Sequence, residues 1–258
     1  MNQYRVYFIG AGPGSADHLT LSGARALQEC ATVFAPIPFD TTFSELLAGK
    51  ELLIPFLYNF QDLLDIIHAR LETTSVAFLM PGDLTFYSPF QAFIDLLGSR
   101  AVVIPGVGTV NVASARLKKT LDLPGVCNRT ILASPRTLGN GPDSPTLGQL
   151  AAPGVTLIIY MNNLPLPQLV AELKSGYGSD VPITLCHRLD LPEETIITAT
   201  LDTLVEQVGD RDFFNLTGAS NRPALTLLIA GATLTASVDG SWWNFRHENL
   251  WRHSAGQE

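Results

Sequence analysis

The sequence predicts an α/β protein in which strands and helices alternate along most of the chain. Short apolar runs recur between segments with helical periodicity, and most of these runs are bounded by Gly, Pro or Asp. Runs that are apolar throughout are typical of parallel strands that helices cover on both faces. With 258 residues, the chain is long enough for one large α/β unit or for two domains.

Nine apolar runs are predicted to be strands: Val6–Ile9, Thr32–Ala35, Val76–Met80, Ala101–Ile104, Thr130–Ala133, Thr156–Met161, Ile183–His187, Ile196–Thr200 and Leu225–Ala230. Helices are expected between them, for example over Ser22–Cys30 and Phe60–Leu71, where apolar residues share one face. The segment from Asn111 to Pro124 begins as a helix and ends in turn residues, so we place a domain boundary within it. The predicted domains are residues 1–115 and 116–258, both of the α/β class.

Two segments fall outside this alternation. The loop Pro135–Pro145 is rich in Gly, Pro, Ser and Asn, and a loop of this length is either a binding element or a solvated connector. Four aromatic residues follow residue 236, and we expect them to pack in the core or between subunits: Trp242, Trp243, Phe245 and Trp251.

Composition and charge exclude several classes of protein. The chain is 46% apolar and 16% charged, which describes a folded globular protein. Its net charge of −8 argues against binding to nucleic acid or to an anionic membrane. The longest apolar runs, Val155–Met161 and Ala224–Ala230, are far shorter than the roughly 18–20 residues of a membrane-spanning helix. The first residues lead directly into a strand and resemble no signal peptide, so we expect a cytoplasmic protein.

Cysteine and histidine spacing gives no sign of a metal site. Cys30, Cys127 and Cys186 are widely separated, so we expect buried, reduced thiols. His187 ends an apolar strand, where a core histidine is commoner than a ligand. The chain has five histidines: His18, His68, His187, His247 and His253. No two of them have the spacing of a helical zinc motif.

A glycine-rich turn, Gly10-Ala11-Gly12-Pro13-Gly14, follows the first predicted strand. It differs from a dinucleotide-binding turn, because Ser15 stands at the third glycine position and no acidic residue ends the next strand. Pro13 also lacks the N–H that a pyrophosphate would use. The sequence contains neither a P-loop nor a G-x-S-x-G motif.

Similar turns follow two other predicted strands. One is Pro81-Gly82-Asp83 with Phe86 and Tyr87 close behind, and the other is Pro105-Gly106-Val107-Gly108-Thr109. The carboxyl ends of parallel strands lie along one edge of a sheet, so the three turns would line one crevice. With a single carboxylate among them, we expect the ligand to be held mainly by backbone.

These turns, in this order, resemble the motifs of the tetrapyrrole methylases, which use S-adenosylmethionine to methylate tetrapyrroles. Further motifs similar to that family are Thr156-Leu157 with Tyr160-Met161, then Pro192-Glu193-Glu194, then Pro223-Ala224-Leu225. Within the family, Leu121-Asp122-Leu123-Pro124-Gly125 and Ser134-Pro135-Arg136-Thr137 are similar to precorrin-4 and cobalt-precorrin-4 C-11 methyltransferases. Ser15, Ala16 and Leu84 depart from the family pattern, as does the loop Pro135–Pro145, which lacks a run similar to Pro-Met-Pro-Glu.

The resemblance implies two α/β domains with the active site in the cleft between them, a homodimer, and S-adenosylmethionine as cofactor. It implies these cofactor-binding residues: Pro13, Pro81, Gly82, Asp83, Phe86, Gly108, Thr109, Met161, Leu189, Ala224 and Leu225. Asp83 would bind the cofactor or brace its own loop. The substrate would be contacted by Gly12 and Tyr87. A tetrapyrrole with many carboxylates also needs cationic partners, and Arg provides a bidentate fork. Five arginines are candidates for this role: Arg116, Arg129, Arg136, Arg188 and Arg222. Among them we favour Arg116 and Arg136.

Direct methyl transfer depends mainly on alignment of carbon, methyl and sulfur, so no catalytic base is assigned. The expected function is methylation of C-11 of precorrin-4 or cobalt-precorrin-4 in cobalamin biosynthesis. Two alternatives stay open. One is a methylase of the same family with another acceptor, such as another precorrin, uroporphyrinogen III or a protein side chain as in diphthine synthesis. The other is a paralogue that binds the cofactor or a tetrapyrrole without turnover.

Overall fold

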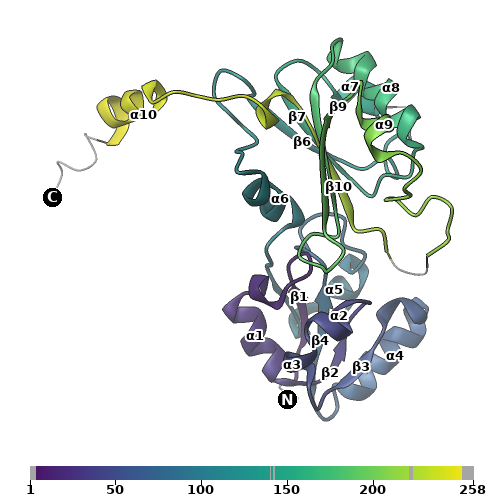
Figure 1. Cartoon of the computed structure of the whole chain (residues 1–258). Helices are drawn as coiled ribbons and strands as arrows, with labels where there is room; N and C mark the ends of the chain where they lie inside the picture. Colours follow the sequence, from purple (N-terminus) through teal and green to yellow (C-terminus); the bar gives the residue numbers. More distant parts are fainter. Residues whose placement is uncertain (1–3, 140, 142, 221–222, 252–258) are drawn as a thin grey trace.

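The chain forms two five-stranded sheets, and Figure 1 shows the second sheet above the first. A computed structural model describes residues 4–139, 141, 143–220 and 223–251. All nine predicted strands are present within a residue or two of their predicted bounds. A tenth, β3 (Glu51–Leu53), was missed by the sequence analysis because its short run is largely exposed and carries a charged residue. We call β1–β5 with their helices the first half, and the chain from α6 to β10 the second half.

The first sheet is parallel throughout, as predicted, with strand order β3-β2-β4-β1-β5. Helices cover both faces: Ile9 packs with α1, α2 and α3 on one side, and Phe8 packs with α4 and α5 on the other. All six residues of β4 are buried. The strands and helices of this half are β1 (Val6–Gly10), α1 (Leu21–Gln28), β2 (Cys30–Phe34), α2 (Phe39–Thr42), α3 (Ser44–Leu47), α4 (Phe60–Arg70), β4 (Ser75–Met80), α5 (Gln91–Leu97) and β5 (Ala101–Ile104).

The second sheet is mixed, with strand order β6-β7-β10-β8-β9, so the expectation of parallel strands was wrong here. Only β6 and β7 run parallel; β10 is antiparallel to both of its neighbours, and β8 is antiparallel to β9. Antiparallel pairing needs only a short turn between β8 and β9, whereas parallel strands need a long crossover. The elements of this half are α6 (Thr109–Leu117), β6 (Arg129–Ala133), α7 (Leu147–Leu150), β7 (Val155–Tyr160), α8 (Leu166–Tyr177), β8 (Pro182–His187), β9 (Thr195–Thr200), α9 (Leu204–Val208) and β10 (Thr226–Ala230).

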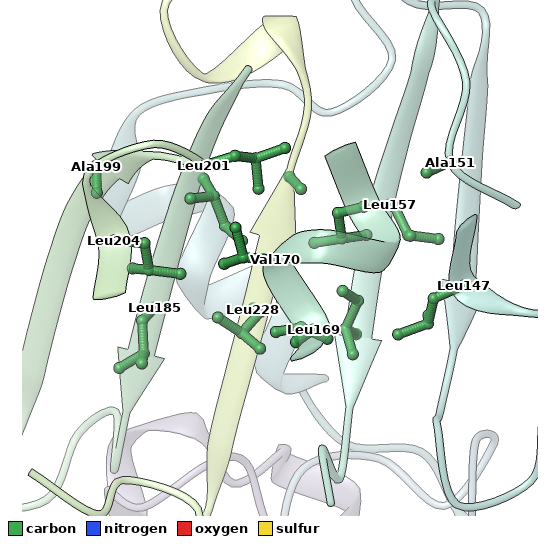
Figure 2. Close-up of a cluster of buried hydrophobic side chains, with 14 of the residues drawn as sticks. Leu147, Ala151, Leu157, Leu169, Val170, Leu185, Ala199, Leu201, Leu204 and Leu228 are labelled. Carbon is green, nitrogen blue, oxygen red and sulfur yellow. The ribbon is translucent and has the colours of Figure 1, made fainter. Parts of the chain in front are cut away.

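The two faces of the second sheet have different covers. On one face, Leu169 and Val170 of α8 pack against Leu157 and Leu228 of the strands, with α7 and α9 beside them (Figure 2). On the other face, Val112 and Ala113 of α6 pack in a cluster with strand residues. The predicted domain boundary after residue 115 falls inside α6, and it stays a prediction.

After β10, the described residues continue into an arm that extends away from both sheets and carries α10 (Ser241–Arg246) and a π-helical turn (His247–Trp251) (Figure 1). The tail aromatics are exposed there, Trp243 by 62% and Phe245 by 59%. Packing in the core of the same chain was therefore a wrong expectation, and packing between subunits stays a prediction. The three cysteines are buried thiols. No helix in the described part of the chain is long and apolar enough to span a membrane.

Candidate active site

A cavity of about 550 Å³ lies between the loops at the carboxyl ends of the first sheet's strands and one set of strand ends of the second sheet. Its lining is mainly apolar, with a small number of polar groups, which is the usual character of a small-molecule site. All of the residues predicted to bind the cofactor line this cavity: Pro13, Pro81, Gly82, Asp83, Phe86, Gly108, Thr109, Met161, Leu189, Ala224 and Leu225. Their role in binding stays a prediction.

Closely packed backbone from the three strand-end turns forms the floor. Gly12 and Gly82 exchange two hydrogen bonds between their main-chain N–H and C=O groups, with N···O distances of 3.1 and 2.8 Å. A Cβ atom on Gly106 would lie 2.4 Å from the Gly82 carbonyl oxygen and 2.5 Å from that of Gly10. No side chain fits there, so glycine is required by close approach of three backbones.

Asp83 braces this floor. One carboxylate oxygen accepts a hydrogen bond from the Thr85 N–H (2.7 Å), and the other accepts one from the Gly106 N–H (2.8 Å). Partial burial raises the pKa of Asp83, but hydrogen bonds from Thr85, Gly106 and Leu84 outweigh it and hold the pKa below its usual value. Of the two roles proposed from the sequence, the geometry supports the brace.

The second half supplies the opposite wall from three neighbouring strands. Tyr160 and Met161 follow from the carboxyl end of β7, and Leu189 follows from that of β8. Because β10 runs antiparallel between them, its amino end lies at the same edge, where Leu225 and Thr226 line the cavity. The rule that parallel strands present their carboxyl ends to a ligand could not have located β10.

Backbone strain is concentrated at this site. In the described part of the chain, seven non-glycine residues have positive φ. Four of them line the cavity: Tyr87, Met161, Asn215 and Leu225. Arg188 and Asp190 flank Leu189, and only Lys118, at the end of α6, lies apart. Such conformations cost about 1–3 kcal/mol each and cluster at functional sites, which supports a function for the cavity.

The predicted substrate residues are not all brought together. Tyr87 and Arg136 line the cavity, and the centroid of the Tyr87 ring lies 5.5 Å from that of Tyr160, which also lines it. Gly12 adjoins the lining through Pro13. Arg116 lies outside the lining, paired with Asp190 (2.5 Å) and Glu194 (3.3 Å). The substrate roles of all four residues stay predictions.

The other arginine candidates lie elsewhere. Arg188 is buried beside Glu193, 3.4 Å away, and the Arg129 guanidinium donates to the Pro153 carbonyl oxygen. Arg222 is outside the described residues. The loop Pro135–Pro145, in which residues 140 and 142 are not described, contributes Arg136 to the cavity.

Titratable groups around the cavity are few. Burial, more than any other factor, raises the pKa of Tyr160 to about 12, so its hydroxyl stays neutral at physiological pH. His187 contacts the Thr226 hydroxyl at 2.7 Å, and burial followed by the Arg188 charge lowers its pKa. The described residues contain no cluster of three potential metal ligands.

Sequence reasoning missed several lining residues: Pro36, Phe56, Asn111, Asn162, Phe214 and Asn215. Phe56 follows the edge strand β3 that the pattern did not reveal, and it is 61% exposed. The departures from the family pattern are accommodated locally. Ser15 caps a short 3-10 turn (Ala16–His18) by accepting from the Asp17 N–H, and Leu84 packs against the core of the first half.

Comparison with known proteins agrees with this architecture. Residues 5–205 match the family described as Tetrapyrrole (Corrin/Porphyrin) Methylases. The chain is 28% identical over 254 residues to a precorrin-4 C(11)-methyltransferase of Pseudomonas aeruginosa, covering 96% of this chain and 98% of that protein. It is 26% identical over 214 residues to a cobalt-precorrin-4 C(11)-methyltransferase of Methanocaldococcus jannaschii, covering 80% and 83%.

Two solved structures share the fold. A cobalt precorrin-4 methyltransferase superposes with a TM-score of 0.73 at 22% identity, covering 90% of this chain and 96% of that one. A uroporphyrin-III C-methyltransferase of Thermus thermophilus, complexed with S-adenosyl homocysteine, gives 0.67 at 24% identity, covering 89% and 98%.

Proposed function

Because the chain belongs to the family of tetrapyrrole (corrin/porphyrin) methylases, we propose that it methylates a tetrapyrrole at the expense of S-adenosylmethionine. The proposed acceptor is C-11 of precorrin-4 or cobalt-precorrin-4, in cobalamin biosynthesis. The names of two relatives, which match 96% and 80% of the chain, support this choice of acceptor. The proposal includes the homodimer that the family resemblance implies and the cytoplasmic location that we expect from the sequence.

The observation that carries the proposal is one cavity lined by every residue predicted to bind the cofactor, with loops from both halves around it. When bound, the cofactor supplies a methyl group on a sulfonium, and a nucleophilic ring carbon receives it as the methyl–sulfur bond breaks. The residues present fit such a group, since the floor is bare backbone and the walls are apolar and aromatic.

The chain's own contribution is alignment and exclusion of water. The floor at Gly82 and Gly106 is fixed by hydrogen bonds and close contacts, so a ligand resting on it would be held in one orientation. Positioning of this kind accounts for up to about 7–11 kcal/mol of a barrier in favourable cases. The faces of Tyr87 and Tyr160 can stabilise a sulfonium cation through their ring electrons. Asp83 is assigned a structural part here, because its two oxygens accept hydrogen bonds from the Thr85 and Gly106 N–H groups.

Recognition of the acceptor is assigned to the mouth of the cavity. Arg136 belongs to the lining and suits a carboxylate side chain of the macrocycle. The exposed rings of Phe56 and Phe86 lie in the same lining and offer apolar surface to the macrocycle. We therefore expect the cofactor to occupy the floor and the tetrapyrrole to enter above it.

The proposal is tested by calorimetric titration with S-adenosylhomocysteine, followed by methylation assays read by mass spectrometry. Precorrin-4, cobalt-precorrin-4 and uroporphyrinogen III serve as acceptors. We expect binding, and transfer of one methyl group to a precorrin-4 form. Binding with methylation of uroporphyrinogen III alone would contradict the acceptor, and absence of binding would contradict the function.

An arginine pair tests the assignment of the substrate. Arg136→Gln should raise KM for the tetrapyrrole about tenfold while leaving S-adenosylhomocysteine affinity unchanged, since one bidentate charged contact is worth about 1.5–3 kcal/mol. Arg129→Gln is the matched control, because its guanidinium contacts only a surface carbonyl among the interactions described. Equal loss of substrate and cofactor binding in Arg136→Gln would place the residue in the fold instead.

A further inference from the structure

A buried carboxylate joins the two halves beside the cavity. The Asp190 side chain, in the turn between β8 and β9, is 2% exposed. Its Oδ2 lies 2.7 Å from Nδ1 of His18, which belongs to the first half, and its Oδ1 accepts a hydrogen bond from Nη2 of Arg116 on α6 at 2.5 Å. One carboxylate on the turn between β8 and β9 therefore contacts two other parts of the chain, His18 of the first half and Arg116 of α6.

The turn that carries Asp190 is held in a strained form. Asp190 has φ +63° and Arg188 has φ +50°, on either side of the cavity-lining Leu189. Glu194 stabilises this form twice, because one of its oxygens accepts from the Asp190 N–H (2.7 Å) and the other from Arg116 Nε (3.3 Å). Strain of this kind persists only where surrounding contacts over-determine it.

The contacts continue from Asp190 to the cavity floor. A Cβ on Gly12 would lie 2.5 Å from Cβ of His18, so the histidine packs directly on the glycine-rich turn. A Cβ on Gly14 would lie 2.8 Å from the Leu189 carbonyl oxygen, so the same turn rests on the strained one. Gly12 in turn pairs with Gly82. An unbroken series of contacts thus runs from Asp190 through His18 and Gly12 to the floor.

We infer that Asp190 is a positioning residue, which acts through His18 and Arg116 to fix the glycine-rich turn and the floor beneath the proposed cofactor site. Asp190 is outside the cavity lining, and so is His18. Their effect on the ligand is therefore indirect, through the backbone at Gly12 and Gly82. The inference rests on the proposed function only for the ligand used in one of its two tests.

The variants are Asp190→Asn, His18→Ala, His18→Asn and the double variant Asp190→Asn with His18→Ala. The side-chain amide of His18→Asn places an N–H donor near the position of Nδ1, where it can reach the Asp190 carboxylate. Arg70→Gln is the matched control, since Arg70 forms an ion pair with Glu51 at 2.6 Å that lies outside the cavity lining. Each variant is measured by calorimetry with S-adenosylhomocysteine and, without ligand, by hydrogen exchange of peptides covering residues 10–19 and 81–87.

We expect Asp190→Asn and His18→Ala each to weaken S-adenosylhomocysteine binding about tenfold and to speed exchange in both peptides. The double variant should be no worse than the single ones, and His18→Asn should restore most of the affinity. Arg70→Gln should change neither readout. If Asp190→Asn merely lowers thermal stability and leaves affinity and exchange at wild-type values, the inference is wrong. If the wild type binds no S-adenosylhomocysteine, the proposed function fails, and hydrogen exchange alone decides on Asp190.

Discussion

The two halves of the molecule build the same cavity by different means. The first half contributes loops at the carboxyl ends of parallel strands, where Gly10, Gly82 and Gly106 bring bare backbone together. The second half contributes side chains, including Tyr160 and Met161, from a mixed sheet in which a reversed strand lies at the centre. In the floor, one added Cβ atom would therefore displace closely packed backbone. In the wall, a side chain can be shortened while the backbone of the sheet stays in place.

The largest effect is expected at the floor. Gly106→Ala introduces a methyl group within 2.5 Å of backbone atoms that cannot move separately, so we expect the free energy of unfolding to fall by at least about 3 kcal/mol. Binding of S-adenosylhomocysteine should be lost. Urea unfolding and calorimetry measure the two effects.

Gly240→Ala is the control for this change, because nothing lies within 4 Å of its added Cβ and its φ is −74°. It should behave as the wild type. A Gly106→Ala protein with normal affinity for S-adenosylhomocysteine would contradict the view that the backbone floor is less tolerant of change than the side-chain wall.

A smaller effect is expected at the brace. Asp83→Asn replaces an oxygen that accepts a backbone N–H with an amide that donates, so one N–H loses its partner at a cost of about 1–3 kcal/mol. S-adenosylhomocysteine affinity should fall about tenfold or more. Asp239→Asn is the control, since Asp239 caps the Ser241 N–H in the arm.

The brace also has a pH dependence. The folded pKa of Asp83 is depressed, so its contribution to stability is present above the unfolded pKa and is lost as pH falls through the lower folded pKa. The difference in stability between wild type and Asp83→Asn should therefore be largest near neutral pH. A difference that grows on acidification would contradict the brace.

The side-chain wall should be more tolerant. Tyr160→Ala removes the ring that faces Tyr87, and we expect a loss of affinity for S-adenosylhomocysteine of about fivefold, since an aromatic pair is worth about 0.5–1.5 kcal/mol beyond its area. The partly exposed position allows the protein to stay folded. Tyr160→Phe keeps the ring and should bind nearly as the wild type does, and a large loss there would show that the hydroxyl is needed.

The smallest effect on stability is expected at the Glu51–Arg70 ion pair, which lies outside the cavity lining. Hydrogen bonds from Arg70, then from Thr32, lower the pKa of Glu51 to about 2 from 4.5. The stabilisation is complete above pH 4.5 and is lost as pH falls toward 2. Because both side chains of the Glu51–Arg70 pair are well exposed, Arg70→Gln should lower stability at pH 7 by less than about 1 kcal/mol. Urea unfolding at pH 7 and pH 3 should show this difference shrinking with acidity.

The same contrast explains what could be predicted from the sequence. Turn residues such as Gly82 and Gly106 follow apolar strands directly, so their place at one edge of a parallel sheet could be inferred. Met161, Leu189 and Leu225 were located only through family resemblance, because strand direction in a mixed sheet leaves no local signal. The role of His18 depends on a carboxylate distant in sequence, and no spacing of residues could reveal their contact.

We propose that the backbone floor and the side-chain wall share one cofactor site. A crystal structure of the protein with S-adenosylhomocysteine would show whether one ligand contacts both. We expect the ligand to contact Gly82 and Gly108 of the floor together with Met161 and Leu225 of the wall. A ligand bound to one half alone, or outside the cavity, would contradict the account.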